Sequence, residues 1–150
     1  MPGGAIAVAS DHAGFDLKEI LKRDLQEAGL DVLDLGTSSA TQSVDYPDFG
    51  AAVADAVASG KARRGVVVCG TGIGISIAAN RNPKVRAAVV HDVTSARLTR
   101  LHNDANVVAF GQRMIGTEVA REALKVFLDT AFEGGRHAGR VAKLSKGCTK

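Results

Sequence analysis

The chain has 150 residues, of which 45% are hydrophobic and 23% charged, a composition that suits one compact domain spanning residues 1–150. The first ten residues lack the charged segment and long apolar stretch of a signal peptide. No apolar run approaches the roughly 18 residues that a membrane span needs. We therefore expect a cytoplasmic location and no membrane partner.

The net charge of +3 comes from the end of the chain. Residues 134–150 contain five Lys or Arg residues and no acidic residue, and the remainder has 14 basic against 16 acidic residues. A nucleic-acid partner is therefore not expected, whereas a local basic segment suits a small anion. We expect residues 143–150 to be a frayed tail without function. The two cysteines, Cys69 and Cys148, are expected to be free thiols.

Short apolar runs alternate with amphipathic stretches along the chain, a pattern typical of repeated βα units around a parallel sheet. The apolar runs predict strands at 5–10, 31–35, 65–69, 86–91 and 106–110. Helical spacing predicts helices at about 17–28, 47–59, 94–101 and 116–131, with a short helix ending near residue 80. The fold class is therefore α/β with a five-stranded parallel sheet.

Polar residues follow four of the five predicted strands. In parallel sheets the carboxyl ends of the strands carry the ligand site, so we expect these residues to lie together. They are Asp11-His12, Cys69 to Gly72, His91-Asp92 and Gly111 to Arg113.

The segment CGTGIGISIAAN, residues 69–80, leads from a buried strand into a helix. Closely spaced glycines allow backbone amides to approach an anion at the start of that helix, and the same position favours the thiolate form of Cys69. In the alternative interpretation Cys69 is a small buried apolar residue and the glycines only form a turn. A dinucleotide site is a further alternative because Asp92 lies 20 residues after Gly72, but the spacing is G-x-G-x-G rather than G-x-G-x-x-G.

Five motifs together resemble the type B ribose-5-phosphate isomerases, relatives of the galactose-6-phosphate isomerases. They are SDHAG (10–14), DYPDF (45–49), CGTGIGISIAANR (69–81), RLHNDANVVAFGQR (100–113) and EGGRHAGRV (133–141), and the match covers residues 5–142. The resemblance implies a Rossmann-like three-layer α/β/α sandwich that interconverts an aldose phosphate and a ketose phosphate without a metal or an organic cofactor. It also implies a homodimer, or a dimer of dimers, with active sites shared between subunits.

By this resemblance Cys69 is the base that moves a proton between C2 and C1, and Thr71 with the amides of Gly70, Gly72, Ile73 and Gly74 stabilises the enediolate. A second branch of the family lacks the cysteine and uses a glutamate six positions later, where this chain has Ile75. The cysteine form of the mechanism is therefore expected.

The resemblance also implies that Asp11 and His12 contact the substrate, that His102 opens the sugar ring with help from Asp11, and that Asn103 binds the substrate. The phosphate would be bound by Arg113, Arg136 and Arg140, and a role for His137 stays open.

Structural alternatives exist for each of these residues. Asp11 can cap the next helix, His102 can cap the end of its own helix, and the arginines can be solvated surface residues. We assign no firm role to His91 and Asp92, which can be structural or border the site. No metal site is expected, because the four histidines show no metal-binding spacing.

Ribose 5-phosphate is the expected substrate. Allose 6-phosphate and galactose 6-phosphate are alternatives, as is a non-catalytic module that binds a phosphosugar or a nucleotide.

Overall fold

A computed structural model describes residues 4–146 of the chain. Within these residues five strands form one parallel sheet in the order β2-β1-β3-β5-β4. The strands are β1 (Ala5–Ser10), β2 (Val32–Asp34), β3 (Ala62–Cys69), β4 (Ala87–Val89) and β5 (Val107–Gly111). The predicted α/β class with five parallel strands is confirmed.

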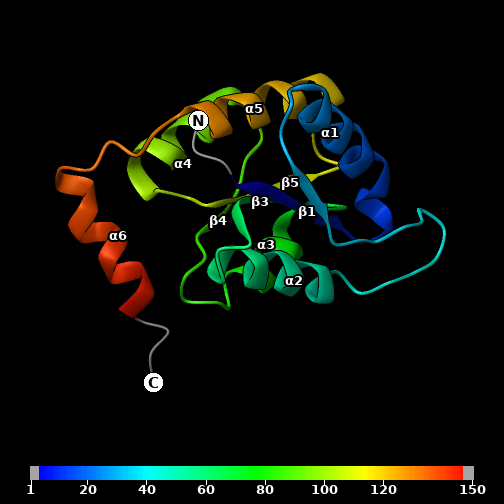
Figure 1. Cartoon of the computed structure of the whole chain (residues 1–150), viewed down its shortest axis with the longest axis horizontal. Helices are drawn as coiled ribbons and strands as arrows, with labels where there is room; N and C mark the ends of the chain where they lie inside the picture. Colours follow the sequence, from blue (N-terminus) through cyan, green and yellow to red (C-terminus); the bar gives the residue numbers. More distant parts are fainter. Residues whose placement is uncertain (1–3, 147–150) are drawn as a thin grey trace.

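Helices cover both faces of the sheet, as Figure 1 shows. They are α1 (Phe15–Glu27), α2 (Tyr46–Ala58), α3 (Ile73–Ala79), α4 (Val93–Asn103), α5 (Thr117–Asp129) and α6 (Arg136–Lys146), and a 3-10 turn, η1 (His12–Gly14), precedes α1. No helix within residues 4–146 is long and apolar enough to cross a membrane.

Alternation along the strands divides the core between the two faces. Val66 and Val68 of β3 pack in the cluster beneath α1, α4 and α5, whereas Val67 and Cys69 pack in the cluster beneath α2 and α3. These two apolar layers create the three-layer sandwich. They also hold the carboxyl ends of β1, β3 and β5 at one edge, where the predicted site residues begin.

Two boundaries differ from the sequence prediction for physical reasons. Strand β3 begins at Ala62 rather than residue 65, because Ala62 and Arg64 also pair with β1, with a register shift between them. The charged side chains of this stretch gave no apolar pattern from which to predict a strand.

The predicted frayed tail at 143–150 is wrong for residues 143–146, which form the last turn of α6. There Leu144 lines a cavity beside α4, and the Ser145 hydroxyl donates to the Pro83 carbonyl over 2.9 Å. Cys148 and the rest of the predicted tail lie outside the described residues.

Candidate active site

Cys69 ends β3 at the carboxyl edge of the sheet and is 4% exposed. The amide of Gly72 donates a hydrogen bond to its Sγ over 3.1 Å, which favours negative charge on the sulfur. Gly72 adopts a left-handed conformation with φ of 79°, which turns the chain back over the strand into α3. The next amide, that of Ile73, donates to the Thr71 hydroxyl over 3.2 Å. The glycine-rich turn therefore directs one of its amides at the predicted base.

Asp11 and His12 lie at the end of β1, the strand beside β3. The Asp11 side chain accepts a hydrogen bond from the Gly14 amide over 3.0 Å, so it does cap the following turn, as the structural alternative expected. This bond uses only Oδ1. His12 is half-buried, and its Nδ1 accepts a hydrogen bond from the Val44 amide over 3.1 Å.

Arg113 follows β5 and lies against the glycine-rich turn. Its amide donates to the Gly70 carbonyl over 3.0 Å, and its Nη1 lies 3.6 Å from the point that a Cβ at Gly70 would occupy. We name the residues gathered at this edge the carboxyl half-site: Asp11, His12, Cys69, Gly70, Thr71, Gly72, Ile73, Gly74 and Arg113.

His102 and Asn103 lie at the amino edge of the sheet, where the parallel strands begin, opposite the carboxyl edge that holds Cys69. They end α4, which returns from the carboxyl end of β4 to the point where β5 begins at Val107. Cys69 pairs with Gly111 at the other end of β5. The five residues of this strand span about 13 Å. Within one chain, His102 and Cys69 therefore lie toward opposite ends of β5.

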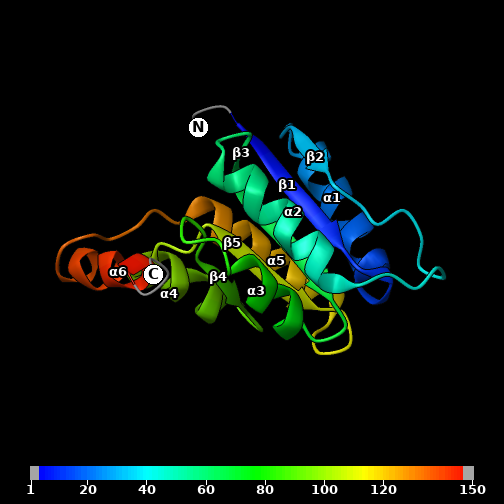
Figure 2. The ribbon, with the colours of Figure 1, turned by 90° about the horizontal axis from the view of Figure 1, so that it is seen from below.

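Arg140 lies with His102 and Asn103 around a cavity of about 280 Å³, which Val141 and Leu144 also line. Arg136 and Arg140 both belong to α6, one helical turn apart. We name His102, Asn103, Arg136 and Arg140 the helical half-site. Figure 2 shows α6 beside α4, at the end of the molecule away from α2 and α1.

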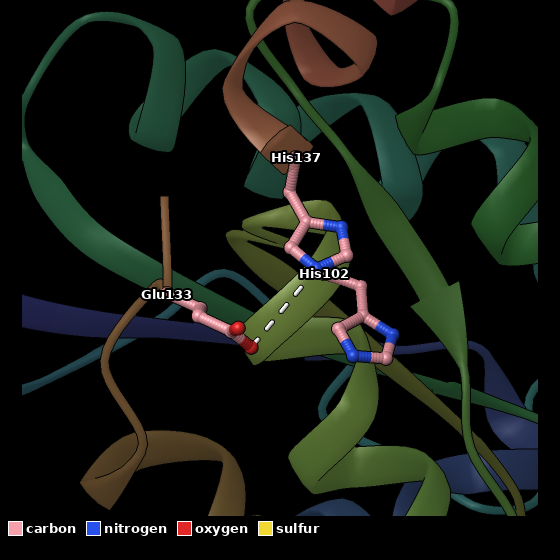
Figure 3. Close-up of side chains that lie close together, drawn as sticks. All are labelled: His102, Glu133 and His137. Atoms are coloured by element: carbon pink, nitrogen blue, oxygen red, sulfur yellow. Dashed lines mark ion pairs between the residues drawn. The ribbon is translucent and has the colours of Figure 1, made fainter. Parts of the chain in front are cut away.

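His137 of α6 stacks on His102, with ring centroids 4.5 Å apart and an angle of 17° between the rings. Figure 3 shows Glu133 beside this pair, with its Oε2 4.0 Å from His137 Nε2. Burial lowers the pKa of His137, and the charges of His102 and Arg136 lower it further, against the opposing effect of Glu133. His137 is thus held in its neutral form at neutral pH.

The ligand atoms of His102, Glu133 and His137 lie within 4.8 Å of one another, a cluster that sequence spacing did not reveal. Two nearly parallel stacked rings do not direct their nitrogen lone pairs at one point, as a tetrahedral metal requires. Arg136 and Arg140 add positive charge beside them. The cluster therefore suits an anion better than a cation.

The structure assigns Asp92 a structural part, since its carboxylate accepts from the Ser95 amide over 2.6 Å and caps α4. That hydrogen bond lowers the pKa of the Asp92 carboxyl. The sequence offered no signal for the Val44 amide, and Glu133 stood in a family motif without an assigned role. Both reach the predicted residues through loop geometry, which no local pattern reports.

The family model described as Ribose/Galactose Isomerase matches residues 6–144. The chain belongs to this family. Ribose-5-phosphate isomerase B of Escherichia coli (strain K12) is 46% identical over 140 residues, covering 93% of each chain. The ribose-5-phosphate isomerase B structure from Clostridium thermocellum matches with a TM-score of 0.93 at 48% identity, covering 95% of each chain. A relative from Pectobacterium atrosepticum, 42% identical over 93% of this chain and 92% of its own, is named D-erythrulose-4-phosphate isomerase.

Membership of the ribose/galactose isomerase family agrees with the resemblance found in the sequence motifs, and the TM-score of 0.93 confirms the predicted Rossmann-like sandwich. The dinucleotide interpretation of the glycine-rich turn loses its basis, because the acid that it required, Asp92, is the cap of α4.

Proposed function

We propose that this chain interconverts D-ribose 5-phosphate and D-ribulose 5-phosphate by ring opening and proton transfer through an enediolate. The observation that carries the proposal is the position of the Cys69 thiol. Its sulfur accepts a hydrogen bond from the Gly72 amide at the carboxyl edge of the sheet, which also holds Asp11, His12 and Arg113. The E. coli and C. thermocellum relatives named for this reaction support the choice of substrate.

In the proposed reaction His102 protonates the ring oxygen of the sugar while Asp11 accepts the proton of the anomeric hydroxyl, which opens the ring. The Cys69 thiolate then takes the proton from C2 and returns it to C1, while the hydroxyl proton on the C2 oxygen passes to the C1 oxygen. Negative charge on the enediolate oxygen is stabilised by the amides of the glycine-rich turn and by Thr71. Arg113, Arg136 and Arg140 bind the phosphate, and Asn103 binds a hydroxyl.

This reaction requires a second copy of the chain, because the carboxyl half-site and the helical half-site lie at opposite edges of the sheet. We propose a homodimer of single-domain subunits, alone or paired as a dimer of dimers, in which the helical half-site of one subunit completes the carboxyl half-site of the other. Exposed apolar side chains beside the glycine-rich turn support such an interface: Tyr46 is 42% exposed, Ile73 50% and Ile77 53%.

A cytoplasmic location belongs to the same proposal, since a reducing compartment keeps the buried thiol of Cys69 free for catalysis. Allose 6-phosphate, galactose 6-phosphate and the four-carbon substrate of the Pectobacterium relative are alternatives for the same chemistry. A non-catalytic phosphosugar module is the alternative outside enzymes.

The test is an assay of ribulose 5-phosphate formation by the purified protein in the presence of a chelator, with the four- and six-carbon phosphates in parallel. We expect turnover that survives chelation and that is fastest with ribose 5-phosphate. Cys69→Ala should bind the sugar phosphate by calorimetry without converting it. Binding without turnover by the wild-type protein on every sugar phosphate would favour the non-catalytic module instead.

A further inference from the structure

Lys18 is a buried charged residue outside both half-sites. It lies on α1 and is 1% exposed. A buried ammonium group is stable only when its donors are used. Its Nζ donates to the Thr37 carbonyl over 2.8 Å and to Asp34 Oδ1 over 3.0 Å, and Glu19 lies 3.1 Å away.

These contacts fix the start of the loop that leads from β2 to α2. The Asp34 carboxylate also accepts from the Gly36 amide over 2.9 Å. Burial alone would raise the pKa of Asp34, but hydrogen bonds from Lys22, Gly36 and Lys18 outweigh it and lower the pKa. Asp34 is therefore an anion that binds the lysines and the loop together at neutral pH.

The same stretch of loop is hydrogen-bonded to the end of β1. The Ser10 amide donates to the Gly36 carbonyl, and the Thr37 amide donates to the Ser10 carbonyl, each over 2.9 Å. Ser10 is two residues before His12. The loop therefore begins at a fixed position beside the segment that carries His12.

The loop returns to His12 at Val44. A backbone amide can only donate, so the bond from Val44 requires an unprotonated Nδ1 on His12, and the proton of the neutral ring lies on Nε2. Between these ends, the Ser39 hydroxyl accepts hydrogen bonds from the amides of Thr41 and Gln42 and shares one with the Thr41 hydroxyl, so these bonds stay within the loop. The loop is thus fixed to the body of the protein at its two ends.

We propose that residues 36–44, pinned by Lys18, act as a strap that holds His12 in the Nε2–H tautomer, so that His12 donates a hydrogen bond to a substrate oxygen rather than acting as a base. Lys18 is then a positioning residue for His12. The contact with substrate rests on the proposed function, whereas the tautomer and the strap do not.

The direct test is a long-range nitrogen–proton NMR spectrum of the protein labelled with ¹⁵N-histidine, recorded at a pH where the imidazoles are neutral. The loss of one signal set in His12→Gln assigns His12. We expect a protonated Nε2 and an unprotonated, hydrogen-bonded Nδ1. A proton on Nδ1 of His12 would overturn the proposal even if the enzyme is fully active.

Lys18→Met tests whether Lys18 fixes the strap, and Lys22→Met is the matched control. Lys22 also contacts Asp34, over 2.8 Å at Oδ2, whereas the hydrogen bond to the Thr37 carbonyl comes from Lys18. In Lys18→Met we expect amide exchange at Val44 to accelerate about tenfold and the His12 nitrogen shifts to move toward the average of the two tautomers. Lys22→Met should leave both unchanged.

With substrate, loss of one positioned hydrogen bond should raise KM about three- to tenfold in Lys18→Met, with a smaller change in kcat. Lys18→Arg, which keeps a donor, should recover part of the loss. If Lys18→Met folds and gives the same Val44 exchange and the same His12 shifts as Lys22→Met, Lys18 does not position His12 and the proposal fails. Because these two readouts need no turnover, an inactive wild-type protein would count against the proposed function alone.

Discussion

Mixing two inactive variants should restore activity if the site is shared between subunits. Cys69→Ala destroys the carboxyl half-site of its own chain and leaves its helical half-site intact, and His102→Asn does the reverse. In a mixed dimer one composite site combines Cys69 from one subunit with His102 from the other, and the second site carries both substitutions. The mixed dimer should therefore have about half the activity of the wild-type dimer.

After unfolding and refolding at equal concentrations, about half of the dimers are mixed, so the mixture should regain about one quarter of the wild-type rate per subunit. The assay is ribulose 5-phosphate formation before and after co-refolding, with each variant refolded alone as the control. The structural basis of this expectation is that the two half-sites lie toward opposite ends of β5, a strand that spans about 13 Å. A dimeric mixture that stays as inactive as its parents would refute the shared site.

Two further predictions concern packing and charge. Gly111→Ala should lower kcat by displacing the glycine-rich turn, because a Cβ at Gly111 would collide with the Thr71 backbone, whereas Gly116→Ala, whose Cβ meets nothing within 4 Å, should retain the wild-type rate. Burial and the charge of His102 lower the pKa of His137 in the folded state, so the free energy of unfolding should fall as the pH drops below about 6.5. Denaturant titrations at several pH values should show a shallower fall in His137→Phe than in the wild-type protein.

Local patterns predicted most of the fold. β1 matches the predicted range of 5–10, because an uninterrupted apolar run of this length is buried on both sides only as an inner strand of the sheet. Helix α6 was not predicted as an element, since its apolar side chains are few; among them, Leu144 lines cavities beside α4 and beside β4.

The members of the site were predictable as residues that follow strands or belong to family motifs. Their division between the carboxyl half-site and the helical half-site was not predicted. His102 is close to β5 in sequence, yet α4 carries it to the edge opposite Cys69. Its stacking partner His137 lies 35 residues later, on another helix, and the Val44 amide reaches His12 across a loop. These contacts depend on how distant segments pack, which spacing along the chain does not encode.

In the proposed function, the decisive step is the transfer of a proton by Cys69 between C2 and C1 of a sugar phosphate. It is tested most directly by running the reaction with ribose 5-phosphate in D₂O and following the product by proton NMR. We expect partial deuterium at C1 of ribulose 5-phosphate in the wild-type protein, because the proton held by the Cys69 thiol can exchange with solvent before it reaches C1, and a rate lower by about a hundredfold or more in Cys69→Ala. An undiminished rate in Cys69→Ala would contradict proton transfer by Cys69.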